Sequence, residues 1–167
     1  DLTAGTLDLL EDYRLYAGLT NRPKKFTVTS PYMLAKMLAN EHYQDLQSLV
    51  LALGDILKQQ VTDIDAEVIQ VDEANVTGHA EDGAIAAAGI NRVLEGVQGE
   101  KAVHLCFGNY GGQVIQKGTY EKLVEFLNAL DVGHVILELA RRPDEEIDML
   151  RDVRPEIGLG IGVIDIK

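Results

Sequence analysis

The sequence has little cysteine, few basic residues and no long apolar run, and each shortage excludes a class of protein. One cysteine, Cys106, among 167 residues cannot form an internal disulfide, so a packed core has to supply the stability. No run of about 18 apolar residues is present, so we expect no membrane-spanning helix. Because no early segment has the charged and apolar regions of a signal peptide, we expect a soluble, cytoplasmic protein.

Acidic residues outnumber basic ones by 27 to 15, which gives a formal net charge of -12. Nucleic-acid binding depends on lysine and arginine side chains that neutralise phosphates, so this charge disfavours a nucleic-acid partner. An apolar fraction of 46% is ample for a core, and 167 residues is the size of one domain. We therefore expect a single domain over residues 1–167, with no nucleic-acid or membrane partner.

Short apolar, β-branched runs alternate with longer segments of helical periodicity. This alternation predicts β/α units built around a parallel sheet, an α/β fold. Helices are indicated by Ser30 as an N-cap with Pro31 after it, and by apolar residues at helical spacing within 46–57 and 123–130. The predicted strands are residues 26–29, 67–72, 102–107, 134–139 and 157–164.

Reactive side chains stand toward the carboxyl ends of these predicted strands, although buried parallel strands are usually almost wholly apolar. Because side chains alternate along a strand, His104 and Cys106 project to one face while Leu105 faces the other. Parallel α/β folds, and the (β/α)8 barrel in particular, place their active sites at this edge. We therefore expect a functional site there.

Two explanations fit Glu138, which lies inside an apolar run. A carboxylate there is costly to desolvate unless it is paired or binds a metal. A salt bridge to Arg141 or Arg142 would satisfy it, and so would a metal ion shared with the neighbouring strand. Imidazole and thiolate are good zinc ligands, but a zinc site needs at least three protein ligands. A carboxylate in addition to His104 and Cys106 favours the metal.

With these residues in place, the chain resembles the catalytic domain of the cobalamin-independent methionine synthase family. The resemblance implies a (β/α)8 barrel in which zinc binds the thiolate of homocysteine, and this thiolate takes a methyl group from methyltetrahydrofolate. The matching segments, in family order, are FTVTSPY (26–32), VIQVDE (68–73), VHLCFGN (103–109), VILE (135–138) and GLGIGVID (158–165).

The resemblance also assigns roles to individual residues. It implies that His104, Cys106 and Glu138 hold Zn2+, and that Asp72 holds the amino group of the amino-acid substrate. Glu73, the next residue, is a second candidate for substrate binding, although it points to the other face of a regular strand. A free thiol has a pKa near 8.5, and coordination deprotonates it while leaving the sulfur nucleophilic.

The chain departs from the family pattern at both ends. The second cysteine ligand of the family is absent, and by this comparison only barrel strands three to seven are present. Five strands cannot close an eight-stranded barrel, so we expect an incomplete barrel. The chain would then be a fragment of a longer one, or would be completed by another chain. Lys167 stands where the long synthases carry a histidine, and is a candidate catalytic proton donor.

Three functions remain open from the sequence. The first is zinc-dependent methyl transfer from a methyltetrahydrofolate-type donor to homocysteine, giving methionine. The second is zinc-dependent alkylation of another thiol such as coenzyme M, because the loop after Cys106 resembles that of the shorter, single-barrel relatives. The third is a non-catalytic binding or assembly module that keeps the sheet but not the metal.

Overall fold

The computed structural model describes residues 2–142 and 144–165, and its strands form one parallel sheet. The strands pair in sequence order from β1 to β5, so each crossover leads to the adjacent strand. This order is that of consecutive strands in a (β/α) barrel, but in the described residues the sheet stays open, with β1 and β5 as its edges. The strands are β1 (Lys25–Thr29), β2 (Val68–Glu73), β3 (Glu100–Leu105), β4 (His134–Glu138) and β5 (Gly158–Gly162).

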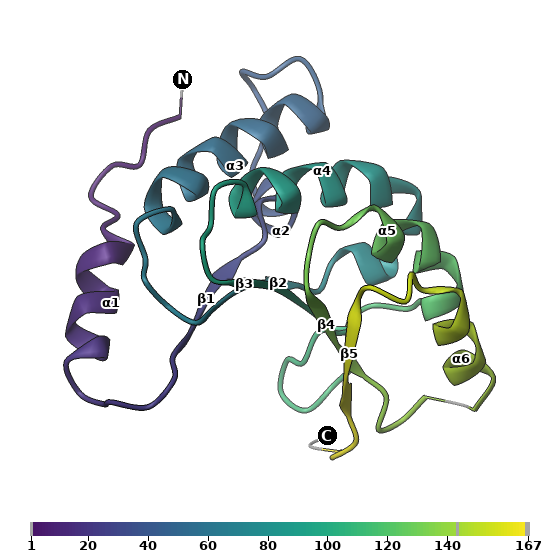
Figure 1. The fold of residues 1–167 in the computed structure, drawn as a ribbon. Helices are drawn as coiled ribbons and strands as arrows, with labels where there is room; N and C mark the ends of the chain where they lie inside the picture. The colour runs from purple at the N-terminus through teal and green to yellow at the C-terminus, as the bar shows by residue number, and fades with distance from the viewer. Residues whose placement is uncertain (1, 143, 166–167) are drawn as a thin grey trace.

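Helices cover one face of this curved sheet, and the concave face has no helix over it in the part of the chain that is described (Figure 1). The helix α1 (Leu9–Ala17) lies beyond the β1 edge. The covering layer consists of α2 (Pro31–Met37), α3 (Leu46–Val61), α4 (Gly83–Leu94), α5 (Val124–Ala129) and α6 (Asp144–Asp148), together with the 3-10 turns η1 (Val76–Gly78), η2 (Ala80–Asp82), η3 (Tyr120–Leu123) and η4 (Met149–Asp152).

The predicted α/β class with parallel β/α units is confirmed, and each predicted strand overlaps an observed one. Ser30 caps α2 as predicted, because its Oγ accepts a hydrogen bond from the Tyr32 backbone N–H at 3.1 Å with Pro31 at the first helical position. No helix among residues 2–142 and 144–165 has the length and apolar character that a bilayer crossing requires.

The two faces of the sheet have different chemistry. Side chains toward the helices are apolar and fully buried, as at Val71, Val103 and Leu137, and they form the core. On the concave face the register aligns Asp72 with His104 and, on the next strand, His104 with Ile136. The alternation of each strand thus separates a core face from a face that carries the reactive groups.

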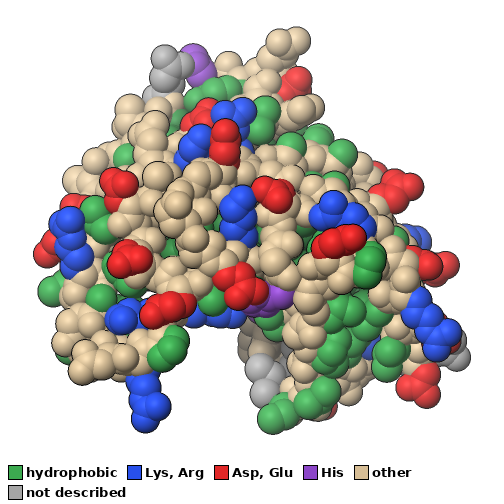
Figure 2. Space-filling view, viewed as in Figure 1, with side chains coloured by type: hydrophobic (Ala, Val, Ile, Leu, Met, Phe, Trp, Pro, Cys, Tyr) green, Lys and Arg blue, Asp and Glu red, His purple; other side chains and the backbone are tan. Residues whose placement is uncertain are grey.

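The β5 edge leaves apolar surface uncovered. Leu159 and Ile161 pair in register with Val135 and Leu137, so they lie on the helix side of the sheet, yet they are 39% and 43% exposed. Ile164, just beyond the strand, is 79% exposed. Figure 2 shows apolar side chains gathered at the lower right of the molecule and a hollow beside them.

Candidate metal and substrate site

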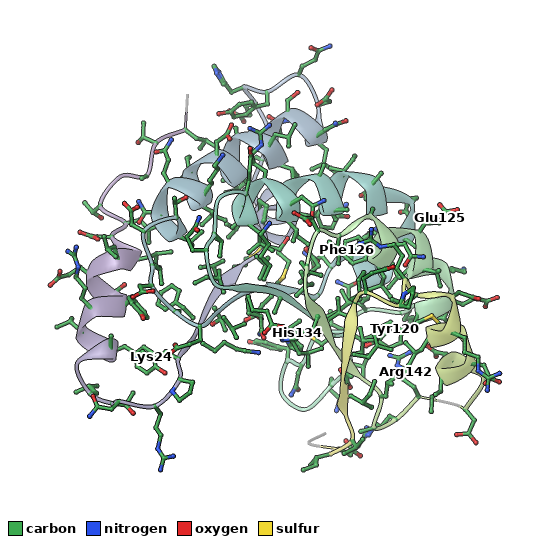
Figure 3. All side chains as sticks on the ribbon, viewed as in Figure 1. Lys24, Tyr120, Glu125, Phe126, His134 and Arg142 are labelled. Carbon is green, nitrogen blue, oxygen red and sulfur yellow. The ribbon has the colours of Figure 1, made fainter. Side chains whose placement is uncertain are left out.

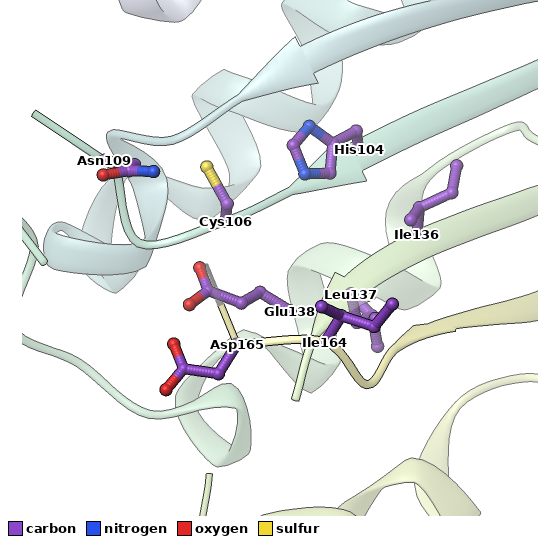
Figure 4. A pocket seen from close by; sticks show the side chains of 9 residues that line it. His104, Cys106, Asn109, Ile136, Leu137, Glu138, Ile164 and Asp165 are labelled. Carbon is purple, nitrogen blue, oxygen red and sulfur yellow. The ribbon is translucent and has the colours of Figure 1, made fainter. Parts of the chain in front are cut away.

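A pocket opens at the carboxyl ends of β3, β4 and β5, the edge that the sequence indicates (Figure 4). Polar and charged side chains from three strand ends meet apolar ones in its wall, so it offers both ligating groups and an apolar surface. The lining residues are His104, Cys106, Asn109, Ile136, Leu137, Glu138, Gly162, Ile164 and Asp165.

Cys106 follows the last residue of β3 and is partly exposed. Its backbone N–H donates to the carbonyl of Glu73 at 3.2 Å, which continues the pairing with β2. Its carbonyl accepts a hydrogen bond from Thr77 Oγ1 at 3.0 Å. These two bonds hold the backbone from which the thiol projects into the pocket.

Glu138 is the last residue of β4 and pairs in register with Gly162 of β5. Because Gly162 has no side chain, the neighbouring strand leaves room beside the Glu138 side chain. In Figure 4 the carboxylates of Glu138 and Asp165 extend to the same side of the pocket. Asp165 Oδ2 accepts a hydrogen bond from Arg141 Nε at 2.6 Å, and Arg142 Nη1 lies 3.4 Å from Glu146 Oε1.

His104 faces Asp72 across β2 and β3, with 3.5 Å between Nδ1 and Oδ1. Gln70 Nε2 donates to the same carboxylate oxygen at 2.6 Å, and Lys25 Nζ donates to Gln70 Oε1 at 2.9 Å. Partial burial raises the pKa of Asp72, but the hydrogen bonds from His104 and Gln70 outweigh it, so the pKa is lowered. Asp72 is therefore a carboxylate at neutral pH, partly open to the concave face.

The three predicted metal ligands fit zinc by donor type. Imidazole nitrogen, thiolate sulfur and carboxylate oxygen are all zinc ligands, and here they come from adjacent strand ends around one pocket. In the part of the chain that is described, however, no three His, Cys, Asp or Glu side chains form a ready cage for a metal ion. His104, Cys106 and Glu138 would have to turn toward one another to share an ion.

Neither Asp72 nor Glu73 is among the residues that line the pocket. Glu73 is 1% exposed on the helix side of β2, where its Oε1 accepts hydrogen bonds from the backbone N–H groups of Asn75 and Val76. The Ser30 side chain also hydrogen-bonds with this carboxylate, so Glu73 belongs to the contacts on the helix side and not to the concave face that carries Asp72 and His104. Lys167 lies outside the described residues.

Asn109 and Asp165 also line the pocket, although they were not among the predicted site residues. The rule that selected Glu138, a polar residue at the carboxyl end of an apolar strand, applies equally to Asp165. Asn109 lies in the loop after β3, and only the loop conformation brings it to the pocket.

A parallel sheet in sequential order, with a pocket that holds reactive side chains at the carboxyl ends of its strands, defines a protein of the (β/α) barrel class. Comparison with family models narrows the class. The chain belongs to the family described as "Cobalamin-independent synthase, Catalytic domain", whose model matches residues 5–167. The family that the sequence resembles is thereby confirmed.

The individual relatives are only distantly similar to this chain in sequence, and they are longer than it. The chain is 28% identical over 145 residues to a methionine synthase of Pyrococcus furiosus, which covers 85% of the chain and 40% of that protein. It is also 28% identical over 162 residues to a methionine synthase of Thermococcus kodakarensis, with 95% and 45% covered. The chain thus spans less than half the length of these curated relatives.

A solved structure supports the fold. The B12-independent methionine synthase from Shewanella sp. W3-18-1, determined in complex with selenomethionine, superposes with a TM-score of 0.75. The match covers 91% of this chain and 48% of that one, at 23% sequence identity. At this identity the likeness establishes a shared fold.

Proposed function

We propose that the chain contributes the central part of a zinc-dependent methyltransferase that transfers a methyl group to the thiol of homocysteine, giving methionine. The methyl donor is of the methyltetrahydrofolate type. The relatives in the same family that are named methionine synthases support this reaction.

The observation that carries the proposal is the meeting of His104, Cys106 and Glu138 in one pocket at the ends of neighbouring strands. These residues supply the nitrogen, sulfur and oxygen ligands. When bound, zinc lowers the pKa of the substrate thiol so that it reacts as a thiolate. Ile136 and Ile164 add an apolar part to the wall around these ligands.

Asp72 is the proposed contact for the amino group of the thiol substrate. Its side chain is 42% exposed on the concave face and lies next to His104, so it is accessible to a ligand bound beside His104. Its lowered pKa keeps it negative at neutral pH, and a carboxylate forms a charge-assisted hydrogen bond with an ammonium group. Asp72 would thus orient the amino acid while the metal holds its sulfur.

Metal analysis of the wild-type protein and of Cys106→Ser tests the proposal. We expect stoichiometric zinc in the wild type and a large loss in the variant, because the chain has no other cysteine. Methyl transfer is then assayed with homocysteine and, separately, with coenzyme M as acceptor. A wild-type protein without zinc, or with zinc that Cys106→Ser retains in full, would contradict the proposal.

We also propose that further strands complete the sheet, either from a longer form of this chain or from another chain. The support is the exposed apolar surface of Leu159 and Ile161 on β5, which pairs only with β4 among the described residues, together with the greater length of the relatives. Hydrogen exchange of the β5 amides tests this. We expect slow exchange in the complete protein, and fast exchange of every edge amide there would contradict it.

A further inference from the structure

Tyr120 lies behind the pocket, in the core between the sheet and the helices. It is the first residue of η3 and is fully buried. Its ring meets that of Phe107 edge to face, with 5.0 Å between centroids. The guanidinium of Arg142 lies 3.3 Å from the ring centroid of Phe107 and 6.0 Å from that of Tyr120. Figure 3 shows the side chains of Tyr120 and Arg142 close together. This packing fixes the direction of the Tyr120 side chain.

The hydroxyl of Tyr120 connects the ends of β3 and β4. It accepts a hydrogen bond from the Glu138 backbone N–H at 2.9 Å. The carbonyls of Leu105, at 3.2 Å, and of Glu138, at 3.1 Å, are acceptors for its proton. The paired register of the two strands ends at Leu105 and Leu137, so the hydroxyl bridges the strands just where their own pairing stops.

The bridged positions are those that carry the proposed metal ligands. Glu138 is itself bonded to the hydroxyl, and Cys106 directly follows Leu105. A shift between the two strand ends would change the distance between the thiol and the carboxylate. A tyrosine hydroxyl has an ordinary pKa near 10, so at neutral pH it carries its proton and is a donor as well as an acceptor.

We propose that Tyr120 is a positioning residue that fixes the backbone of the strand ends at Cys106 and Glu138, from which their side chains turn toward a shared metal ion. This inference rests on the zinc-dependent function proposed above. Tyr120 touches neither metal nor substrate, because its hydroxyl bonds to backbone on the helix side of the sheet. Its effect passes through the backbone of the ligand residues, as outer hydrogen bonds do in other metal sites.

The matched experiment compares Tyr120→Phe with Tyr32→Phe. Both tyrosines are fully buried and each loses one hydroxyl, but that of Tyr32 bonds to Asp82 at 2.7 Å, away from the strand ends that carry the proposed ligands. Zinc affinity is measured by competition with a chelator. We expect Tyr120→Phe to weaken it by about 10- to 100-fold, the usual effect of an outer-shell change. Tyr32→Phe is expected to leave it unchanged.

A metal-free measurement separates this inference from the proposed function. In the wild type the Tyr120 hydroxyl proton should be visible by NMR, with a cross-peak to the Glu138 amide. In Tyr120→Phe that amide should exchange at least about tenfold faster, while Tyr32→Phe leaves it protected. If Tyr120→Phe does not fold, the hydroxyl signal and the cross-peak of the wild type still test whether the hydroxyl bridges the two strand ends.

The outcomes are distinct. A wild type that binds no zinc overturns the proposed function and, with it, the role of Tyr120 in metal binding. A wild type that binds zinc, with equal affinities in Tyr120→Phe and Tyr32→Phe, overturns the positioning role alone. The absence of the hydroxyl signal and its cross-peak overturns the bridge itself.

Discussion

Asp72 and His104 face each other across neighbouring strands, with Oδ1 of the carboxylate 3.5 Å from Nδ1 of the imidazole. Both side chains are partly exposed on the concave face, at 42% and 36%. The carboxylate is thus placed to meet a substrate ammonium while it stands beside a proposed metal ligand. Two substitutions separate these roles. One removes the charge of Asp72, and the other removes the nitrogen ligand of His104.

Asp72→Asn keeps the size of the side chain and an oxygen for Gln70 but removes the negative charge. We expect homocysteine binding to the zinc-loaded protein, measured by calorimetry, to weaken by roughly 10- to 100-fold, because hydrogen bonds to charged groups contribute about 1.5–3 kcal/mol. Bound zinc is expected to stay stoichiometric. Unchanged homocysteine affinity would remove Asp72 from the proposed substrate site.

His104→Gln tests the nitrogen ligand, with His134→Gln as its control. His134 begins β4 at the opposite end of the sheet, where its Nδ1 lies 2.6 Å from Glu100 Oε1. We expect zinc affinity to fall at least about 100-fold in His104→Gln, since losing a ligand exceeds the 10- to 100-fold effect of losing an outer partner. Chelator competition measures both variants. Equal affinities would exclude His104 as a ligand.

The arrangement of the core strands was predictable because it depends on local patterns. Apolar, β-branched runs between helical segments gave the parallel order, and strict alternation assigned Val103 and Leu105 to the core and His104 to the other face. The position of the pocket was also predictable, because the carboxyl ends of parallel strands lie at one edge of the sheet.

The end of the third strand at Leu105 and the position of Tyr120 were not predictable in this way. The third strand was expected to run to Phe107 but ends at Leu105. The carbonyl of Phe107 instead accepts hydrogen bonds from the backbone of Ile115 and Gln116, at 3.1 and 2.9 Å, within its own loop. Tyr120 returns to the strand ends after that loop, so no local periodicity marks it.

The buried carboxyl of Glu73 gives a pH-dependent prediction. Burial raises its pKa above the ordinary 4.5, although hydrogen bonds with the Ser30 side chain and with the backbone N–H groups of Val76, Asn75 and Ala74 lower it in part. The folded protein therefore binds this proton more tightly than the unfolded chain does. The associated stability is fully present below the unfolded pKa and is lost as pH rises through the raised folded pKa.

Glu73→Gln cannot ionise and keeps an oxygen for the backbone donors Asn75 and Val76. We expect the free energy of unfolding of the variant, relative to that of the wild type, to increase from mildly acidic to mildly alkaline pH. Urea unfolding at several pH values measures the difference. A difference that does not change with pH would mean that Glu73 titrates alike in the folded and unfolded protein.

Gly89 in α4 lies against side chains of α3 and α2. A Cβ at this position would collide with Val50 Cγ1 of α3 and lie 3.0 Å from Pro31 Cγ of α2. In an open helix, glycine to alanine stabilises by about 0.5–1 kcal/mol, but overpacking a core costs about 1–3 kcal/mol. We therefore expect Gly89→Ala to lower the free energy of unfolding in urea by about 1–2 kcal/mol.

Gly18→Ala is the control for this contact. Gly18 follows α1 with φ of -69°, and its Cβ would meet nothing nearer than the Leu15 carbonyl at 3.5 Å. Alanine fits there without strain, so the free energy of unfolding should stay within about 0.5 kcal/mol of the wild type or rise. If both variants were as stable as the wild type, α3 and α4 would have to lie farther apart than in this fold. These helices cover the back of β2 and β3, the strands that carry Asp72 and His104. Such a result would therefore mean that these strands are packed less tightly from behind than in this fold.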